Sequence, residues 1–197
     1  MRLVLDIQSL QSDSRLRGIG RYTRSVIAEL AAANPHLEIV LLLNGSYGGD
    51  SQALMEELAT SIRGAINKST FDKYTPCIYA HNKGAFAKGA ATDGGVKKDT
   101  ASNSAALDYV QCFLPGPTGA YDPANLVRES LAELLREAFI RELEPDLVHV
   151  FSVMEGYADN VVTSIGRLTV DYPVTATFYD LIPLLNPEDY LHTNVAF

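Results

Sequence analysis

A loop rich in glycine and arginine offers the clearest chemistry in this sequence. It runs from Ser14 to Arg24, reads SRLRGIGRYTR and contains arginines at positions 15, 17, 21 and 24. Its two glycines, Gly18 and Gly20, let a ligand approach the backbone closely, and arginine side chains are bidentate donors to phosphate or carboxylate groups. A helical period begins at Ile19, and the start of a helix favours an anion. The pattern fits a phosphate-facing loop or a tight turn with solvated arginines, and both interpretations stay open.

Two familiar nucleotide-binding motifs do not fit this loop. The dinucleotide fingerprint GxGxxG needs a third glycine where the chain has Thr23, and an acidic ribose ligand where the second strand ends in Asn44. A P-loop needs a Lys-Ser/Thr pair after the glycines, and none follows. An NAD-dependent oxidoreductase is therefore disfavoured.

A second set of polar residues follows two apolar segments late in the chain. Glu155 comes after the first segment, and Tyr179 and Asp180 come at the end of the second. If the two strands are neighbours, these side chains share one crevice, where a carboxylate and a phenol suit a polyhydroxylated ligand. Asp180 fits equally well as a turn residue before Pro183. His149 is expected to be packed within its strand rather than catalytic.

The pattern of apolar residues predicts an α/β fold. Continuous apolar runs are typical of strands buried in a parallel sheet, and residues at helical spacing lie between them. Strands are expected over residues 2–7, 37–43, 107–114, 147–153 and 173–179, and helices over 19–34, 51–63 and 123–143. On the last helix we expect positions 127, 131, 134, 135, 138 and 139 to form the buried face. A short helix is expected after Asp159. The alternation indicates a mainly parallel sheet with helices on both faces, that is, a Rossmann-like fold.

One stretch does not fit this alternation. Residues 84–104 contain four glycines and five alanines with neither helical nor strand spacing. We therefore predict a flexible insertion over residues 81–106. It is either a surface loop or a lid over a site.

Composition excludes several classes of protein. The 197 residues are 47% hydrophobic and 20% charged, which supports a sizeable core. A net charge of −8 argues against general affinity for nucleic acid, and no window is apolar enough to span a bilayer. The two cysteines, Cys77 and Cys112, form neither a disulfide framework nor a metal motif, so a reducing, cytoplasmic location is expected. Neither a metal nor a cofactor is expected.

Four strings of residues together resemble a known enzyme family. They are MRLVLDIQSLQ, SRLRGIGRYT, PDLVHVFSVMEG and TFYDLIPLLNPEDYL, which span the chain from residue 1 to about 191 with a gap over 65–106. The combination resembles the N-terminal domain of GT-B glycosyltransferases of group 1, also called family 4. The strings resemble in particular a subgroup of these retaining enzymes that assembles bacterial surface polysaccharides.

This resemblance implies an enzyme of two Rossmann-like domains that moves a sugar from a nucleotide-sugar to a saccharide or lipid-linked acceptor. Residues 1–197 would be the acceptor-side domain, and the donor-binding domain would be absent from this chain, which alone should be inactive. The family's glycine loop corresponds to Gly18, Ile19, Gly20 and Arg21, which would lie near the donor. Tyr179 stands where the family often has a histidine.

Further expectations follow for the residues and partners. Asp180 is the candidate catalytic residue, and Glu155 and Tyr179 join the glycine loop as candidate substrate-binding residues. Peripheral contact with the inner face of the membrane and self-association of the uncovered domain are also expected, with an apolar or arginine-bearing surface near residues 15–22 and 179–186. The alternative is a non-catalytic Rossmann-like module that binds saccharide or a partner subunit.

Overall fold

The computed structural model describes residues 1–34, 36–47, 51–61, 106–168, 171–180 and 185–186. The insertion expected at 81–106 lies outside this part of the chain, except for Ala106, where a strand begins. Among the described residues, no helix has the length and apolar character needed to cross a bilayer.

Five parallel strands form a single sheet in the described part of the chain. The strands are β1 (Arg2–Asp6), β2 (Glu38–Asn44), β3 (Ala106–Cys112), β4 (Leu147–Val150) and β5 (Val174–Ala176). Their order across the sheet is β3-β2-β1-β4-β5. Leu5 of β1 pairs with Leu41 of β2 on one side and with His149 of β4 on the other. The expected parallel sheet is confirmed, although β5 is shorter than the segment 173–179.

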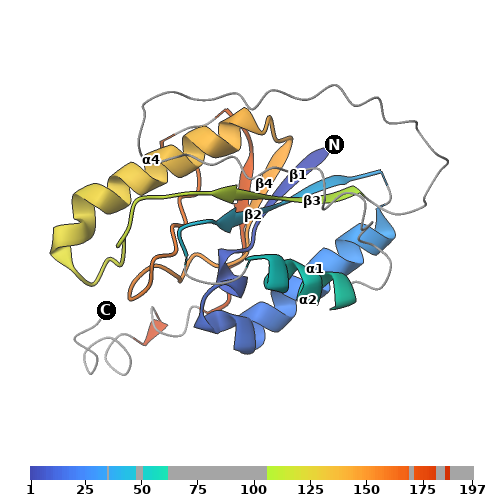
Figure 1. Cartoon of the computed structure of the whole chain (residues 1–197), viewed down its shortest axis with the longest axis horizontal. Coiled ribbons are helices and arrows are strands. Elements are labelled where there is room, and N and C mark those ends of the chain that lie inside the picture. The colour runs from blue at the N-terminus through green and yellow to red at the C-terminus, as the bar shows by residue number, and fades with distance from the viewer. Residues whose placement is uncertain (35, 48–50, 62–105, 169–170, 181–184, 187–197) are drawn as a thin grey trace.

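Helices cover both faces of this sheet, as Figure 1 shows. The helices are α1 (Gly18–Ala33), α2 (Ser51–Ser61) and α4 (Leu126–Glu142), with 3-10 turns η1 (Gln8–Leu10), η2 (Asp13–Leu16) and η3 (Pro123–Asn125). One apolar core lies under α1 and α2 and includes Ile27 and Leu58. A second core lies under α4 and includes Phe139 and Ile140. The fold is therefore the Rossmann-like α/β arrangement that the sequence predicts.

Helix α4 packs on the sheet with a different face from the one that its apolar spacing predicts. Val127 is 83% exposed and Leu131 and Leu134 are close to half exposed, so much of the expected buried face is at the surface. Arg136 and Glu137, each 1% exposed, are buried instead. Arg136 donates to Asp6 of β1 and to the carbonyl of Ser164. Glu137 accepts from the Ser164 hydroxyl and from the backbone N–H groups of Arg167 and Leu168. The hydrogen bonds of these two buried polar residues account for the different face.

The short helix expected after Asp159 is not formed. The Asp159 carboxylate accepts hydrogen bonds from the backbone N–H groups of Gly156 and Val161, both at 3.0 Å. It therefore closes a loop between residues 156 and 161 instead of capping a helix.

Candidate functional site

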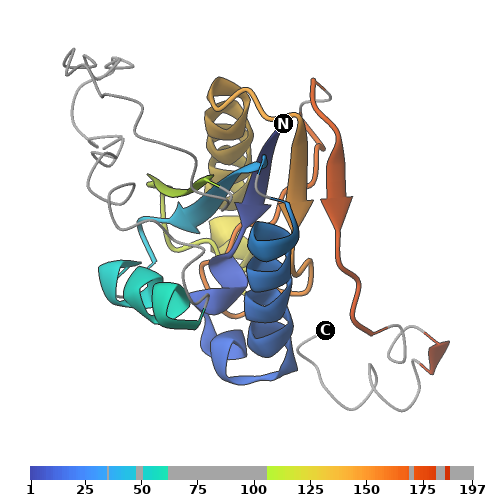
Figure 2. The same ribbon diagram turned by 90° about the vertical axis from the view of Figure 1, so that its right-hand side faces the viewer.

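Between β1 and β4, the direction in which the chain adds strands to the sheet reverses, and the carboxyl ends of these two strands lie side by side. From β1 the chain continues outward through β2 and β3, whereas β4 and β5 lie on the other side of β1. Figure 2 shows β1, β4 and β5 side by side, with α1 packed across the sheet. In open α/β sheets, ligands bind outside the carboxyl ends of the strands at such a switch point. The loops after β1 and β4 are therefore the first place to look for a site.

The glycine and arginine loop predicted from sequence forms the start of α1 at this edge. Arg17 occupies the N-cap position, but its side chain makes no capping hydrogen bond, and the first turn carries no acidic residue. The positive end of the helix dipole is thus not offset by a local carboxylate. Arg21 is exposed in the first turn, where it extends from the same helix end.

The two glycines of this loop have different surroundings. A Cβ atom on Gly18 would meet no heavy atom within 4 Å. A Cβ atom on Gly20 would overlap the backbone carbonyl of Arg15, because η2 packs directly on the first turn of α1. Gly20 is therefore needed for packing of the loop, whereas the backbone at Gly18 is open to a ligand. Ile19 lies between them and is half-buried.

Glu155 lies in the loop after β4 and reaches across to the loop after β1. Its carboxylate accepts hydrogen bonds from the hydroxyls of Ser14 at 2.7 Å, Ser12 at 3.0 Å and Ser152 at 3.3 Å. The structure thus brings Glu155 together with the segment that precedes the glycines. The crevice expected between Glu155, Tyr179 and Asp180 stays a prediction. No local pattern in the sequence identifies the serine partners, which lie 141 and 143 residues away for Ser14 and Ser12.

Tyr179 packs against α1 just beyond β5. Its ring meets that of Tyr22 edge to face with 5.5 Å between centroids, and Tyr22 also contacts Phe151 at 6.3 Å. Burial raises the pKa of Tyr179, and the nearby hydroxyl of Thr23 opposes that rise. The phenol therefore stays protonated near neutral pH and can donate or accept a hydrogen bond.

Asp180 is exposed beside Tyr179 at the same edge. Residues 181–184 lie outside the described part of the chain, so the alternative turn before Pro183 is not tested. The structure thus places Tyr179 against α1 and ties Glu155 to the segment before α1. Tyr179 and Glu155 make the contacts described above, and Arg21 and Asp180 are both exposed.

His149 joins β4 to β5. Its Nδ1 atom lies 2.9 Å from the Thr175 hydroxyl, and its Nε2 atom lies 3.0 Å from the Thr177 hydroxyl. The ring also packs edge to face on Phe151, with 4.7 Å between centroids. Burial lowers the pKa of His149, so the neutral ring is favoured. These contacts agree with the expected packed histidine, and they help to fix the strand that leads to Tyr179.

Side-chain amides that no sequence pattern indicates hold the neighbouring loops. The Gln8 amide bonds both the N–H and the C=O of Val162, at 3.1 and 2.8 Å, and so acts like one more strand pairing. Gln11 bonds the backbone of Asn44 in the same way, at 2.8 and 2.9 Å. The Asn44 amide in turn donates to the carbonyl of Asn160 at 3.1 Å. Because these pairs join distant parts of the chain, sequence spacing does not reveal them.

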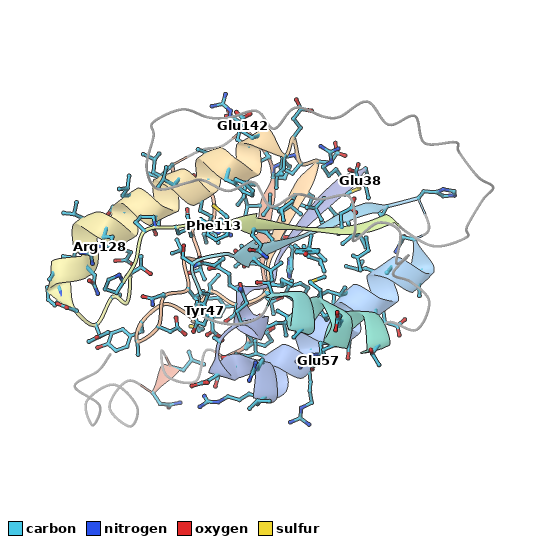
Figure 3. All side chains as sticks on the ribbon, in the orientation of Figure 1. Glu38, Tyr47, Glu57, Phe113, Arg128 and Glu142 are labelled. Carbon is cyan, nitrogen blue, oxygen red and sulfur yellow. The ribbon has the colours of Figure 1, made fainter. Side chains whose placement is uncertain are left out.

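Tyr47 lies near several carboxylates at this edge of the sheet. Figure 3 labels Tyr47, which follows the end of β2. Burial, with smaller contributions from the carboxylates of Asp159, Asp13 and Glu155, raises its pKa to about 12.

A hollow of about 270 Å³ lies between α4 and the β4 loop and is lined in part by Glu133 and Glu155. In the described residues, no group of three or more His, Cys, Asp or Glu side chains is placed to hold a metal ion.

Comparison with known proteins gives similarity to one kind of enzyme. The chain is 25% identical over 194 residues to a serotype-specific mannosyltransferase WbdA of Escherichia coli, a match that covers 97% of this chain and 18% of the relative. A second E. coli WbdA mannosyltransferase is 37% identical over 75 residues, which is 38% of this chain and 9% of that relative. The chain therefore spans less than a fifth of the length of these relatives. No protein-family model and no solved structure matches it.

Proposed function

We propose that this chain forms the acceptor side of a glycosyltransferase that moves a sugar from a nucleotide-sugar to a saccharide or lipid-linked acceptor during synthesis of a surface polysaccharide. The observation that carries the proposal is the similarity of 97% of the chain to a mannosyltransferase. The glycine and arginine segment at the sheet's switch point supports it, since that is where an α/β fold binds a ligand.

The proposed enzyme is a retaining GT-B glycosyltransferase of group 1, or family 4. Residues 1–197 are its acceptor-side domain, and a second Rossmann-like domain binds most of the nucleotide-sugar. The active site then lies between the two domains, and this chain alone is inactive. Closure of the domains excludes water and aligns the acceptor with the donor.

The start of α1 is proposed to face the donor diphosphate. Backbone N–H groups of Gly18, Ile19 and Gly20 lie at the positive end of the helix, and Arg21 adds a guanidinium there. As the bond from sugar to diphosphate breaks, negative charge grows on the leaving group. Fixed N–H donors and a cation stabilise that charge more than they stabilise the bound donor. The open space above Gly18 permits the close approach this requires.

Tyr179 and Asp180 are proposed to meet the sugars. The Tyr179 phenol is held in place by Tyr22 and remains protonated near neutral pH. Its hydroxyl oxygen is buried in this structure, and we propose that it donates to a sugar hydroxyl once the second domain and the substrates are in place. Asp180 is the proposed catalytic residue, whose carboxylate accepts a hydrogen bond from the reacting hydroxyl.

Exposed apolar side chains support the proposal that this part of the chain faces another domain. Leu16 is 76% exposed, Phe178 51% and Leu185 73%. Arg15, Arg17 and Arg21 are exposed within the same loop. When no partner domain covers them, such side chains favour self-association of the chain. A lipid-linked acceptor would bring the enzyme to the cytoplasmic face of the membrane.

The proposal is tested by expressing the polypeptide that the gene encodes in full and incubating it with a panel of nucleotide-sugars of mannose, glucose and galactose. Turnover that requires an acceptor, with residues 1–197 alone inactive, supports the proposal. Binding of saccharide by residues 1–197, with no turnover by the full polypeptide, would instead indicate a non-catalytic binding module.

A further inference from the structure

We propose that Glu155 is a positioning residue that holds the segment before α1, and does not bind substrate. Its carboxylate fixes residues 12–16 against the first turn of α1 and thereby sets the place of the backbone at Gly18. The effect on sugar transfer rests on the proposed function, whereas the positioning itself rests only on contacts within this chain.

The hydrogen-bonding capacity of the Glu155 carboxylate is largely used by protein groups. One oxygen, Oε1, accepts from Ser14 and Ser152. The other, Oε2, accepts from Ser12 at 3.0 Å, closer than the Ser9 carbonyl that the same hydroxyl also approaches at 3.3 Å. A carboxylate has about four acceptor positions in all, so three hydroxyl donors leave little for a ligand. Bonds to a charged acceptor are also about twice as strong as neutral ones, which suits an anchor.

The loop that carries Glu155 is itself firmly placed. Gly156 has a φ of 94°, and a Cβ atom there would lie 2.6 Å from the carbonyl oxygen of Val161. Its N–H group is held by Asp159 at 3.0 Å. Ser152, on the other side of Glu155, is 3% exposed. The carboxylate therefore projects from a fixed support at the end of β4.

A continuous series of contacts leads from Glu155 to the start of α1. Ser12 is the N-cap of η2, and its hydroxyl accepts from the N–H of Ser14 at 3.2 Å. Both serines thus tie η2 to Glu155. The backbone of Arg15, within η2, is the group that lies against Gly20 in the first turn of α1. Movement of η2 away from β4 would therefore release the first turn of α1.

Hydrogen exchange tests the positioning without reference to any activity. In Glu155→Ala, amide exchange across residues 12–20 should rise about tenfold or more, because three charge-assisted bonds are lost. Glu155→Gln keeps one carbonyl oxygen as an acceptor and should fall between Glu155→Ala and the wild type. The matched control is Glu142→Ala, which removes an exposed glutamate of α4 (labelled in Figure 3) and should leave exchange at 12–20 unchanged. Unchanged exchange in Glu155→Ala and Glu155→Gln would overturn the proposal.

Kinetics of the full polypeptide test how the residue acts on transfer. Glu155→Ala and the double variant Ser12→Ala/Ser14→Ala should lower kcat/KM for the nucleotide-sugar by the same factor. Combining all three substitutions should cause no further loss, because they remove one set of bonds. If Glu155→Ala does not fold, the serine double variant and Glu155→Gln carry the same comparison.

If the factors by which kcat/KM falls multiply when the substitutions are combined, Glu155 contacts the substrate independently of the serines. The proposal would then be wrong. Absence of turnover in the wild-type polypeptide would contradict the proposed function instead. In that case the exchange experiment still decides whether Glu155 holds the segment before α1.

Discussion

Arg136 of α4 and Asp6 of β1 form an ion pair whose side chains are only 1% and 2% exposed. The guanidinium Nε donates to Asp6 Oδ2 at 3.0 Å, and a second guanidinium nitrogen donates to the carbonyl of Ser164. The same carboxylate accepts from the Gln8 backbone N–H at 3.0 Å. The pair therefore connects a helix on one face of the sheet with the loop that leads to the candidate site.

Breaking this pair from one side should destabilise the chain strongly. Arg136→Met leaves the Asp6 carboxylate buried without its cation, which costs about 3–5 kcal/mol in the free energy of unfolding. Urea denaturation measures the loss. Arg141→Ala is the control, because it removes the exposed pair between Arg141 and Asp171 and should cost less than about 1 kcal/mol. Similar losses in the two variants would contradict a stabilising buried pair.

The two glycines at the start of α1 should respond differently to alanine. Gly20→Ala places a methyl group on the Arg15 carbonyl and should lower the free energy of unfolding by about 1–3 kcal/mol. Gly18→Ala meets open space and should change it by no more than about 1 kcal/mol in either direction. In the full polypeptide, Gly18→Ala should still lower turnover, because the methyl group fills the space where the donor approaches. Full activity in Gly18→Ala would place the donor elsewhere.

His149 should make the chain less stable in mild acid. Since burial holds the pKa of His149 below its ordinary value of 6.5, the unfolded chain takes up the proton at a higher pH than the folded chain does. The stability that the neutral ring contributes is present above pH 6.5 and is lost as the pH falls below it. The difference in free energy of unfolding between wild type and His149→Gln should therefore shrink from pH 7.5 to pH 5.5, measured by urea denaturation at each pH. If this difference in free energy of unfolding stays constant or grows toward pH 5.5, the folded state does not disfavour the protonated ring.

Much of the fold could be predicted because its signals are local. The apolar runs at Leu41 and Val148 mark buried strands, and their alternation with helices leaves a parallel sheet as the natural arrangement. The buried face of α4 was predicted only in part: Phe139 is buried and Leu135 packs against the core, but Arg136 and Glu137 have the character of surface residues in a helical pattern. Their partners, Asp6 and the chain near Ser164, lie far away in sequence, and only folding brings them together.

In the candidate site, too, local signals could be predicted from sequence and contacts between distant residues could not. The glycines and arginines of the loop, together with the strand ends at Glu155 and Tyr179, could be singled out from residue type and position. The serine hydroxyls that hold Glu155 could not, because a serine carries no mark of the partner it will have. The difference between Gly18 and Gly20 likewise depends on where η2 packs, which spacing alone does not fix.

The most direct test of the account is the effect of Arg21→Ala on nucleotide-sugar turnover by the full polypeptide. Arg141→Ala serves as the control, because Arg141 is an exposed arginine near the end of α4. We predict that Arg21→Ala lowers kcat/KM for the donor by about tenfold or more, through loss of a charge-assisted contact to the diphosphate, while Arg141→Ala leaves it unchanged. Unchanged KM and kcat in Arg21→Ala, with the wild-type enzyme active, would contradict the placement of the donor at the start of α1.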